Sequence, residues 1–312
     1  MSRKTIIVHS PEYANWFFSK EHPTQGRRFI NGYNAMKAQL SVLEPRPATV
    51  AELSRVHSPE YVNQVLNDHT CFEWGGARED LAGFAQLFTG GTLVALNALL
   101  DGSANLAIHL PGAKHHAQQD HSSGFCVFND FALAAEIATK DHGLKVAILD
   151  IDAHHGDGVE NLTADNQSVL TYSIHEADIF PGSGYENDLT QNIYNYPLTE
   201  KTGKGDLALL AGVNNFIEVA QEFSPDLLFI TCGADGLADD PLTNLKYTVA
   251  GYAAAAAVVA AAFPQTPILM GGAGGYLPDS GTPEVWAAVA NELAANQKNT
   301  NEGDICIHNF IQ

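Results

Sequence analysis

The feature that most constrains the fold is a series of short apolar runs, each followed directly by polar or glycine residues. The runs are continuous rather than alternating, which is typical of strands buried on both faces of a parallel sheet. The runs are Thr5–His9, Asn105–His109, Val146–Asp150, Val169–Ile174, Leu227–Thr231, Pro267–Met270 and Ile305–His308. Longer segments with a helical pattern lie between them, and this alternation of strands and helices predicts an α/β fold.

Capping residues mark where several helices begin. Ser58-Pro59-Glu60 and Thr282-Pro283-Glu284 each place a hydroxyl residue before a proline at the first helical position, and Thr49 with Glu52 matches a capping box. Further helices are predicted at Arg28–Leu40, Leu81–Leu100, Phe131–Thr139, Leu207–Glu222 and Leu245–Ala262. No repeat, charge block or Gly/Ser linker divides the chain. We therefore predict that residues 1–312 form one domain, built on a single open, mostly parallel sheet between layers of helices.

The charge balance argues against two classes of partner. The chain has 16 Lys and Arg against 36 Asp and Glu, which gives a formal net charge of −20. Such a protein repels phosphates and anionic lipids, so neither nucleic acid nor a membrane surface is expected as a direct partner. A cationic substrate is compatible with this charge. Surface charge that serves solubility, or life in salt, explains it more simply.

The cysteines and the apolar runs indicate in which cellular compartment the protein is expected. Four cysteines (Cys71, Cys126, Cys232 and Cys306) form no C-x-x-C pair, so neither a disulfide framework nor a zinc ribbon is indicated. The apolar run within the first ten residues is shorter than the core of a signal peptide. The longest apolar run, Tyr252–Phe263, falls short of the ~20 residues that a membrane span needs. The sequence therefore predicts a cytoplasmic protein.

A candidate metal site follows the strand at Val146–Asp150. Ligand sites in open parallel sheets lie beyond the carboxyl ends of the strands. Asp150, Asp152 and His154 are alternate residues, which share one face of an extended chain. Carboxylate and imidazole groups are ordinary zinc ligands. A lone D-x-H is more often a polar strand end, but the neighbouring His155 and Asp157 favour a metal site.

Polar clusters follow three other predicted strands. His115-His116 is one, and neutral imidazole is the usual base near pH 7. Asp235 is another, and the third is the glycine-rich run before Tyr276. That run lacks the Lys-Ser/Thr of a phosphate loop, whereas a tyrosine on a flexible glycine arm suits an oxyanion donor. Taken singly, paired histidines are more often structural, and an Asp after a strand is usually a helix cap.

In order and spacing these clusters resemble the zinc-dependent histone deacetylase family, which includes bacterial deacetylase-like amidohydrolases and acetylpolyamine amidohydrolases. The resemblance spans roughly residues 20 to 280. Its motifs are His115-His116 with Gly124-Phe125-Cys126, Asp150 to Gly158, Cys232-Gly233-Ala234-Asp235 and Gly274-Gly275-Tyr276. Shorter matches are His22-Pro23 with Arg28, Val56-His57 before Tyr61, and Phe180-Pro181-Gly182. The resemblance implies an arginase/deacetylase-like fold and one catalytic domain.

The resemblance also implies a role for each matched residue. The zinc ligands match Asp152, His154 and Asp235. The catalytic residues match His115, His116, Tyr276, Asp150 and Asp157, with His116 as the general base, Tyr276 as the transition-state donor and the two acids orienting the histidines. The substrate tunnel matches Gly124, Phe125, Phe180 and Leu242. A structural cation site, usually for K⁺, matches Asp150, Asp152, His154, Ser173 and Ile174.

The function implied is a zinc-dependent amidohydrolase with one catalytic Zn²⁺ per chain and a structural K⁺. Its substrate would be an acetylated lysine in a peptide or protein, or a small acetylated amine. An acetylpolyamine deacetylase is the alternative. The segment between His57 and His115 is short for that branch, whereas the net charge would suit a polyamine.

Two rivals remain. An arginase-type dimanganese hydrolase needs acids where Gly156 and Gly233 stand, and an inactive acyl-lysine-binding module would be favoured by loss of Tyr276 or a zinc ligand, all of which are present. This chain departs from the family pattern at two places, Ala273 in the glycine run and Ala113-Lys114 before the His pair. We expect Lys114 to alter the rim of the substrate tunnel. We also expect three acids, Glu12, Glu21 and Glu73, near the mouth of that tunnel.

Overall fold

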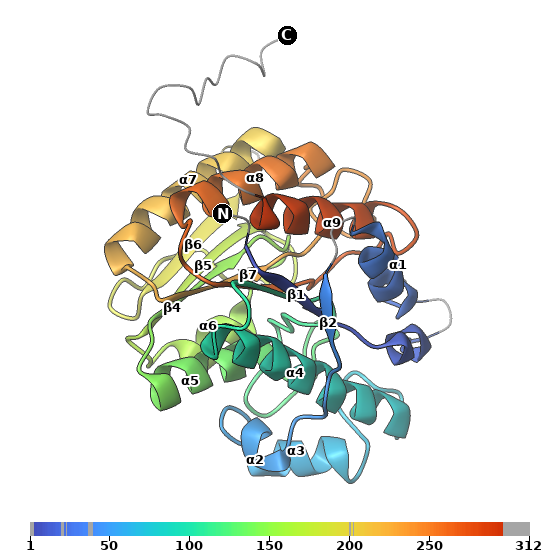
Figure 1. Ribbon diagram of the computed structural model, residues 1–312. Helices are drawn as coiled ribbons and strands as arrows, with labels where there is room; N and C mark the ends of the chain where they lie inside the picture. The colour runs from blue at the N-terminus through green and yellow to red at the C-terminus, as the bar shows by residue number, and fades with distance from the viewer. Residues whose placement is uncertain are drawn as a thin grey trace.

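The computed structural model describes residues 3–19, 22, 24–36, 40–199, 201 and 203–295. Its centre is an eight-stranded sheet of order β2-β1-β3-β8-β7-β4-β5-β6, with every neighbouring pair parallel (Figure 1). The strands are β1 Thr5–Val8, β2 Ser41–Leu43, β3 Leu106–His109, β4 Val146–Asp150, β5 Val169–Glu176, β6 Ile193–Leu198, β7 Leu227–Thr231 and β8 Ile268–Gly271. The predicted open, mostly parallel sheet is confirmed.

Helices cover both faces of the sheet. In Figure 1, α1, α7, α8 and α9 lie on one side and α4, α5 and α6 on the other, with α2 and α3 outside α4. The helices are η1 Pro11–Asn15, α1 Arg27–Ala35, α2 Val50–Leu53, α3 Pro59–Leu66, α4 Glu79–Leu100, α5 Asp130–His142, α6 Asp157–Thr163, α7 Asp206–Phe223, α8 Val249–Ala262 and α9 Gly281–Ala294. The sheet is therefore buried on both sides.

Burial on both faces explains the continuous apolar runs. Every residue of β4 is buried. Val146 and Ile148 belong to the apolar cluster that contains Phe131 of α5, whereas Leu149 belongs to the cluster that contains Val259 of α8. Since alternate side chains of a strand point to opposite faces, a strand between two helix layers needs an apolar residue at every position.

The predicted strands from Thr5–His9 to Pro267–Met270 are all present, and two further strands were not predicted. Both are at edges of the sheet. The first two residues of β2 are exposed, and the four central residues of β6 are only partly buried. β6 also contains Pro197, which is tolerated at an edge. Neither strand shows a continuous apolar run for that reason. The predicted strand Ile305–His308 lies outside the described residues.

Most predicted helix starts are confirmed. The Thr49 hydroxyl accepts from Glu52 N in a capping box, and the Ser58 hydroxyl accepts from Tyr61 N. The prediction for Thr282 was wrong, because α9 begins at Gly281 and the Thr282 hydroxyl accepts from Leu277 N instead.

One other helix prediction needs correction. The start of α8 was predicted too early: the helix begins at Val249 with Thr248 as its N-cap, and Leu245 lies before it in the core. The short helix α6 was not predicted.

The apolar composition of α4 reflects burial. This 22-residue helix is long and apolar enough to cross a membrane by length and composition alone, with a window of mean hydropathy 1.4. Within the protein, 61% of that window is buried, and the helix contacts α5 and β3. Packing between the sheet and its neighbours therefore accounts for the apolar pattern.

The strand order determines where the polar clusters meet. The strands β3, β8, β7 and β4 are consecutive in the sheet, although the chain reaches them in a different order. Their carboxyl ends are His109, Gly271, Thr231 and Asp150. Because parallel strands end at the same edge, the four polar clusters that follow these strands come together there.

Candidate active site

Asp152, His154 and Asp235 form a buried group at this edge. Asp152 and His154 follow β4 and Asp235 follows β7, and one ligand atom from each lies within 4.8 Å of the others. His154 Nδ1 is 3.1 Å from Asp152 Oδ1 and 3.0 Å from Asp235 Oδ2. Among the residues that the structure describes, no other group of His, Cys, Asp and Glu converges in this way.

Backbone N–H groups hold the two carboxylates in place. Asp152 Oδ2 accepts from Gly274 N at 2.7 Å, and Asp235 Oδ1 accepts from Ala153 N at 2.9 Å. The other oxygen of each carboxylate faces the His154 ring, and Asp152 Oδ1 also accepts from His154 N at 2.9 Å. The sites of the ligand atoms are therefore set by the loops that follow three strands.

The electrostatics of this group suit a bound cation. Burial disfavours the charged form of His154, but Asp235 and Asp152 outweigh it and raise the pKa of His154 to about 11. Burial opposes charge on Asp152 as well, yet His115 and His154 hold the pKa of that carboxyl well below its usual range. A concentration of negative charge around one imidazole, with N and O donors close together, fits the donor set of a three-ligand zinc site.

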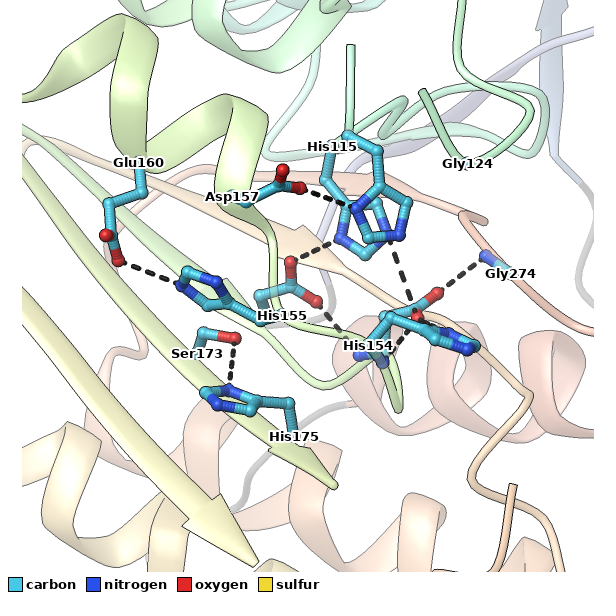
Figure 2. Close-up of polar contacts among 12 residues, drawn as sticks. His115, Gly124, His154, His155, Asp157, Glu160, Ser173, His175 and Gly274 are labelled. Atoms are coloured by element: carbon cyan, nitrogen blue, oxygen red, sulfur yellow. Dashed lines mark hydrogen bonds and ion pairs between the residues drawn. The ribbon is translucent and has the colours of Figure 1, made fainter. Parts of the chain in front are cut away.

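The two adjacent histidines each bond to a carboxylate. His115 Nδ1 lies 2.7 Å from Asp150 Oδ2, and His116 Nδ1 lies 2.7 Å from Asp157 Oδ1 (Figure 2). Asp150 ends β4 and Asp157 begins α6. The Gln118 amide donates to the second oxygen of Asp157 at 2.8 Å, which further orients it. Each imidazole is therefore fixed with Nε2 directed away from its carboxylate.

The two dyads differ in protonation. Burial disfavours the charged form of His115, but Asp150 and Asp152 outweigh it and raise the pKa of His115 to about 9. Burial and the neighbouring His115 lower the pKa of His116 to about 4, against the opposing effect of Asp157. At neutral pH His115 is then protonated and His116 is neutral. A neutral imidazole and an imidazolium side by side are suited to accept one proton and donate another.

The predicted tunnel residues lie around His116, but the rings of Phe125 and Phe180 are not placed symmetrically about it. The Phe180 ring is half exposed and packs edge-on, 5.0 Å from His116 and 6.3 Å from His154. Gly124 has a positive φ of 53°, and a Cβ there would overlap the His116 ring. Phe125, with a φ of 63°, faces Tyr276 at 6.4 Å. Leu242 is 47% exposed.

Tyr276 lines the same cavity as the metal group and the two histidines. Its backbone N–H donates to Asp240 Oδ2 at 2.9 Å, and within the described part of the chain its hydroxyl has no hydrogen-bond partner. We expected a flexible glycine arm. The structure instead shows Gly274 packed against the ligand carboxylates, where a Cβ would overlap Asp235. Glycine serves close approach here.

The predicted structural cation residues lie behind the metal group. Asp150 and Ser173 are register partners across β4 and β5. Asp150 Oδ1 accepts from Asp152 N, and the Ser173 hydroxyl pairs with His175 Nδ1 at 3.0 Å. Ile174 is completely buried. Asp152 and His154 belong to the metal group already described, and K⁺ at this place stays a prediction.

One expectation about the mouth of the site was wrong. The Lys114 ammonium does not lie at the rim of the tunnel, because it points to aromatic rings, 5.7 Å from the Trp16 ring centre and 5.8 Å from the Phe88 ring centre. Glu73 lies beside the cavity, where its carboxylate accepts from Phe125 N. It thereby supports the backbone beside the cavity. Glu12 is exposed on η1, and Glu21 lies outside the described residues.

One cluster was missed by the sequence analysis. His155 Nδ1 pairs with the Ser183 hydroxyl and its Nε2 with Glu160, each at 2.9 Å. His175 Nε2 pairs with Gly184 O at 3.0 Å. Figure 2 shows the contact between His155 and Glu160. These contacts anchor the segment that begins with Phe180. His155 lies in a recognised motif, but its partner Ser183 comes from 28 residues further along, and no local signal pairs the two.

Two glycines near the metal group leave no place for the ligands of a second metal, and this gives a first prediction. A Cβ at Gly156 would approach Asp150 Oδ2 to 2.5 Å, and one at Gly233 would overlap Asp152, so neither position has room for a second-metal carboxylate. Elemental analysis of the active protein should find one tightly bound divalent metal per chain. Two tightly bound transition metals per chain would instead support a dinuclear hydrolase.

Known proteins are similar to this chain in sequence and in fold. The family described as "Histone deacetylase domain" matches residues 20–293. The acetoin utilization protein AcuC of Bacillus subtilis (strain 168) is 34% identical over 272 residues, covering 79% of this chain and 70% of the relative. AcuC of Staphylococcus aureus (strain MRSA252) is 32% identical over 316 residues, covering 92% and 80%. The crystal structure of the HDA15 HD domain superposes with a TM-score of 0.81 at 25% identity, covering 94% of this chain and 91% of that one.

Proposed function

Because the chain belongs to the histone deacetylase family, we propose that it is a zinc-dependent amidohydrolase that removes acetyl groups from Nε-acetyl-lysine-type substrates. The observation that carries the proposal is the convergence of the metal group, both His–Asp dyads and Tyr276 on one cavity. Each group that hydrolysis of an amide needs is therefore present within a single site.

Asp152, His154 and Asp235 would hold the zinc ion. Three protein ligands are the number found in catalytic zinc sites, which keep one position open. When bound there, zinc supplies Lewis acidity that polarises the amide carbonyl and lowers the pKa of an attacking water towards ~7. The second oxygens of the two carboxylates are already bonded to backbone N–H groups, so the ligands are oriented in advance.

His116 would act as the general base. It is neutral at pH 7, and its Nδ1 is bonded to Asp157, which leaves Nε2 to take a proton from the water. His115, whose pKa is raised to about 9 when burial is outweighed by Asp150 and Asp152, carries a proton that can pass to the leaving amine. As the amide C–N bond breaks, the products are acetate and a free amine. The Asp partners hold both rings in the orientation that these transfers need.

Tyr276 would donate a hydrogen bond to the developing oxyanion. Its ring borders the cavity together with Asp152, His154 and both catalytic histidines. Its backbone is held by Asp240, so the phenol is placed before substrate arrives. Preorganised donors of this kind are a large part of transition-state stabilisation in acyl transfer. Burial raises the pKa of Tyr276 further above 10, which keeps the phenol protonated as a donor.

The substrate would be an acetylated primary amine on a linear aliphatic stem. The half-exposed Phe180 ring beside His116 provides an apolar wall where the stem would pass, and burial of methylenes contributes roughly 0.8 kcal/mol each. The alternative is an acetylpolyamine, which the formal net charge of −20 favours. A structural K⁺ at Asp150 and Ser173, and a cytoplasmic location, are further parts of the proposal.

A substrate panel tests this proposal. With the zinc-loaded protein, we expect a higher kcat/KM for Nε-acetyl-lysine peptides than for acetylputrescine or acetylspermidine. Linear hydroxamates should inhibit by chelating the metal, and protein stripped of its metal serves as the control. A clear kcat/KM advantage for the acetylpolyamines would establish the alternative. Absence of hydrolysis for every acetylated amine in the metal-loaded protein would contradict the deacetylase proposal itself.

A further inference from the structure

A second cavity adjoins the active site. It is walled by aromatic rings, among them Trp16, Trp74 and Phe88, and it shares Lys114 and Phe125 with the cavity that contains the metal group and Tyr276. Both Trp16 and Phe88 are buried. The two cavities therefore meet at Lys114 and Phe125, and the reaction as described above does not use the aromatic chamber.

Lys114 brings an ammonium group into this chamber, where its contacts within the described structure are with aromatic rings. Its Nζ lies near the Trp16 and Phe88 rings, and the structure shows no hydrogen bond or ion pair from Nζ to any described residue. The nearby acid Asp130 does not neutralise it by contact. One Asp130 oxygen accepts from Lys114 N at 2.7 Å, and the other accepts from Ala113 N and the Thr92 hydroxyl.

This arrangement leaves a positive charge that a ligand could satisfy. Burial lowers the pKa of Lys114 to about 8, so the amine is still largely protonated at pH 7. A second cation, Arg28, is 2% exposed and borders the same catalytic cavity. Its guanidinium donates to Gly275 O, whereas its Nε has no partner in the described structure. Two cations, Lys114 and Arg28, therefore border the catalytic cavity together with the carboxylate of Asp152.

The direction of the substrate determines which of its parts meets Lys114. The amine stem would enter beside the half-exposed Phe180, next to His116 and His154. With the amide carbonyl at the metal group, the acyl chain beyond it points towards the interior and Lys114. An acetyl methyl offers no partner for an ammonium. A carboxylate at the end of a short methylene chain does, because charge-assisted pairs are strong away from water and aromatic walls suit methylenes.

We propose that Lys114 is a specificity-determining residue that pairs with the terminal carboxylate of a short dicarboxylic acyl group, such as the succinyl group of Nε-succinyl-lysine. The inference rests on the proposed amidohydrolase function and extends its range of acyl groups. The chemistry is the same hydrolysis: water adds to the amide carbonyl, the C–N bond breaks, and a proton passes to the amine. The products are a dicarboxylate and free lysine side chain, with no further reactant.

Matched peptides and variants test the role of Lys114. The substrates are one peptide carrying acetyl-, butyryl- or succinyl-lysine, so that butyryl matches succinyl in length without its charge. Wild type should cleave the succinyl peptide with a kcat/KM at least equal to that for butyryl. Lys114→Met, which keeps the length and removes the charge, should lower the succinyl-to-butyryl ratio of kcat/KM by about 10-fold or more, as expected when a site loses its polar partner. Lys114→Arg should keep most of that ratio.

The control is Lys140→Met, a change at an exposed lysine in the last turn of α5, which should leave the ratio at the wild-type value. Metal content and thermal unfolding of each variant report whether it is folded. An unchanged ratio in folded Lys114→Met, or a wild type that cleaves acetyl-lysine but not succinyl-lysine, would overturn the role of Lys114 and leave the deacetylase proposal standing. Failure on all three acyl peptides would count against the deacetylase proposal itself.

Discussion

Replacement of His116 by alanine is expected to lower kcat by about 10²–10⁴-fold, which is the usual worth of a general base. The reason is that His116 combines a pKa lowered to about 4 by burial and His115 with a bond from Nδ1 to Asp157. It is therefore neutral and oriented at working pH. Since it is not one of the three metal-group residues, the variant should keep its metal. Steady-state kinetics and metal analysis on the same sample measure both.

Two comparisons make the His116 result specific. His115→Ala should lose less activity than His116→Ala, because the proton donor assists only departure of the amine. His121→Ala changes an exposed histidine that pairs with Asp120, and it should behave as wild type. Full turnover in the His116 variant, or loss of its metal, would show that the base has been assigned to the wrong residue.

Tyr276→Phe is expected to lower kcat by about 10²–10³-fold while KM changes little, by analogy with the loss of other oxyanion donors. Phenylalanine keeps the ring that borders the cavity and that packs edge-on against Phe125, and it removes only the hydroxyl. Because that hydroxyl has no partner among the described residues, its removal leaves no protein group unsatisfied. The effect should therefore appear in the chemical step, as measured by single-turnover kinetics at saturating substrate.

Tyr185→Phe is the matched control for this change. Tyr185 is half exposed and its hydroxyl donates to Asp178, outside the cavity. The same deletion of one hydroxyl there should leave kcat at the wild-type value. A near-normal kcat in Tyr276→Phe would show that the metal alone stabilises the oxyanion, and the role given to Tyr276 would then be withdrawn.

Much of the site could be predicted from the sequence because its motifs are local. Asp152 and His154 are two residues apart directly after a buried strand, and the His115-His116 pair follows another, so strand endings alone indicated where these groups stand. Contacts between residues of distant segments could not be predicted from such local motifs. The bond between His116 and Asp157 could be inferred only from the family resemblance. The pairing of His155 with Ser183 was not inferred at all, since neither residue type nor spacing specifies it.

The position of Lys114 in the sequence did not predict where its side chain lies. It directly precedes the catalytic pair, and a charged residue beside an open site is expected at the rim. The carboxylate of Asp130 instead accepts from the backbone N–H groups of Ala113 and Lys114, and the Lys114 ammonium lies against the packed rings of Trp16 and Phe88. The direction of that side chain follows from a buried polar contact that only the folded chain provides.

What the sequence by itself determined is the set of central strands, most helices and the chemical groups at the strand ends. It could do so because burial on two faces demands continuous apolar residues, as in β4, and because caps such as Thr49 act within one turn. The tertiary structure alone decided the edge strands β2 and β6, the strand order that brings β3, β8, β7 and β4 together, and the opposite pKa shifts of His115 and His116. These depend on pairing, burial and charges contributed by segments far apart in the chain.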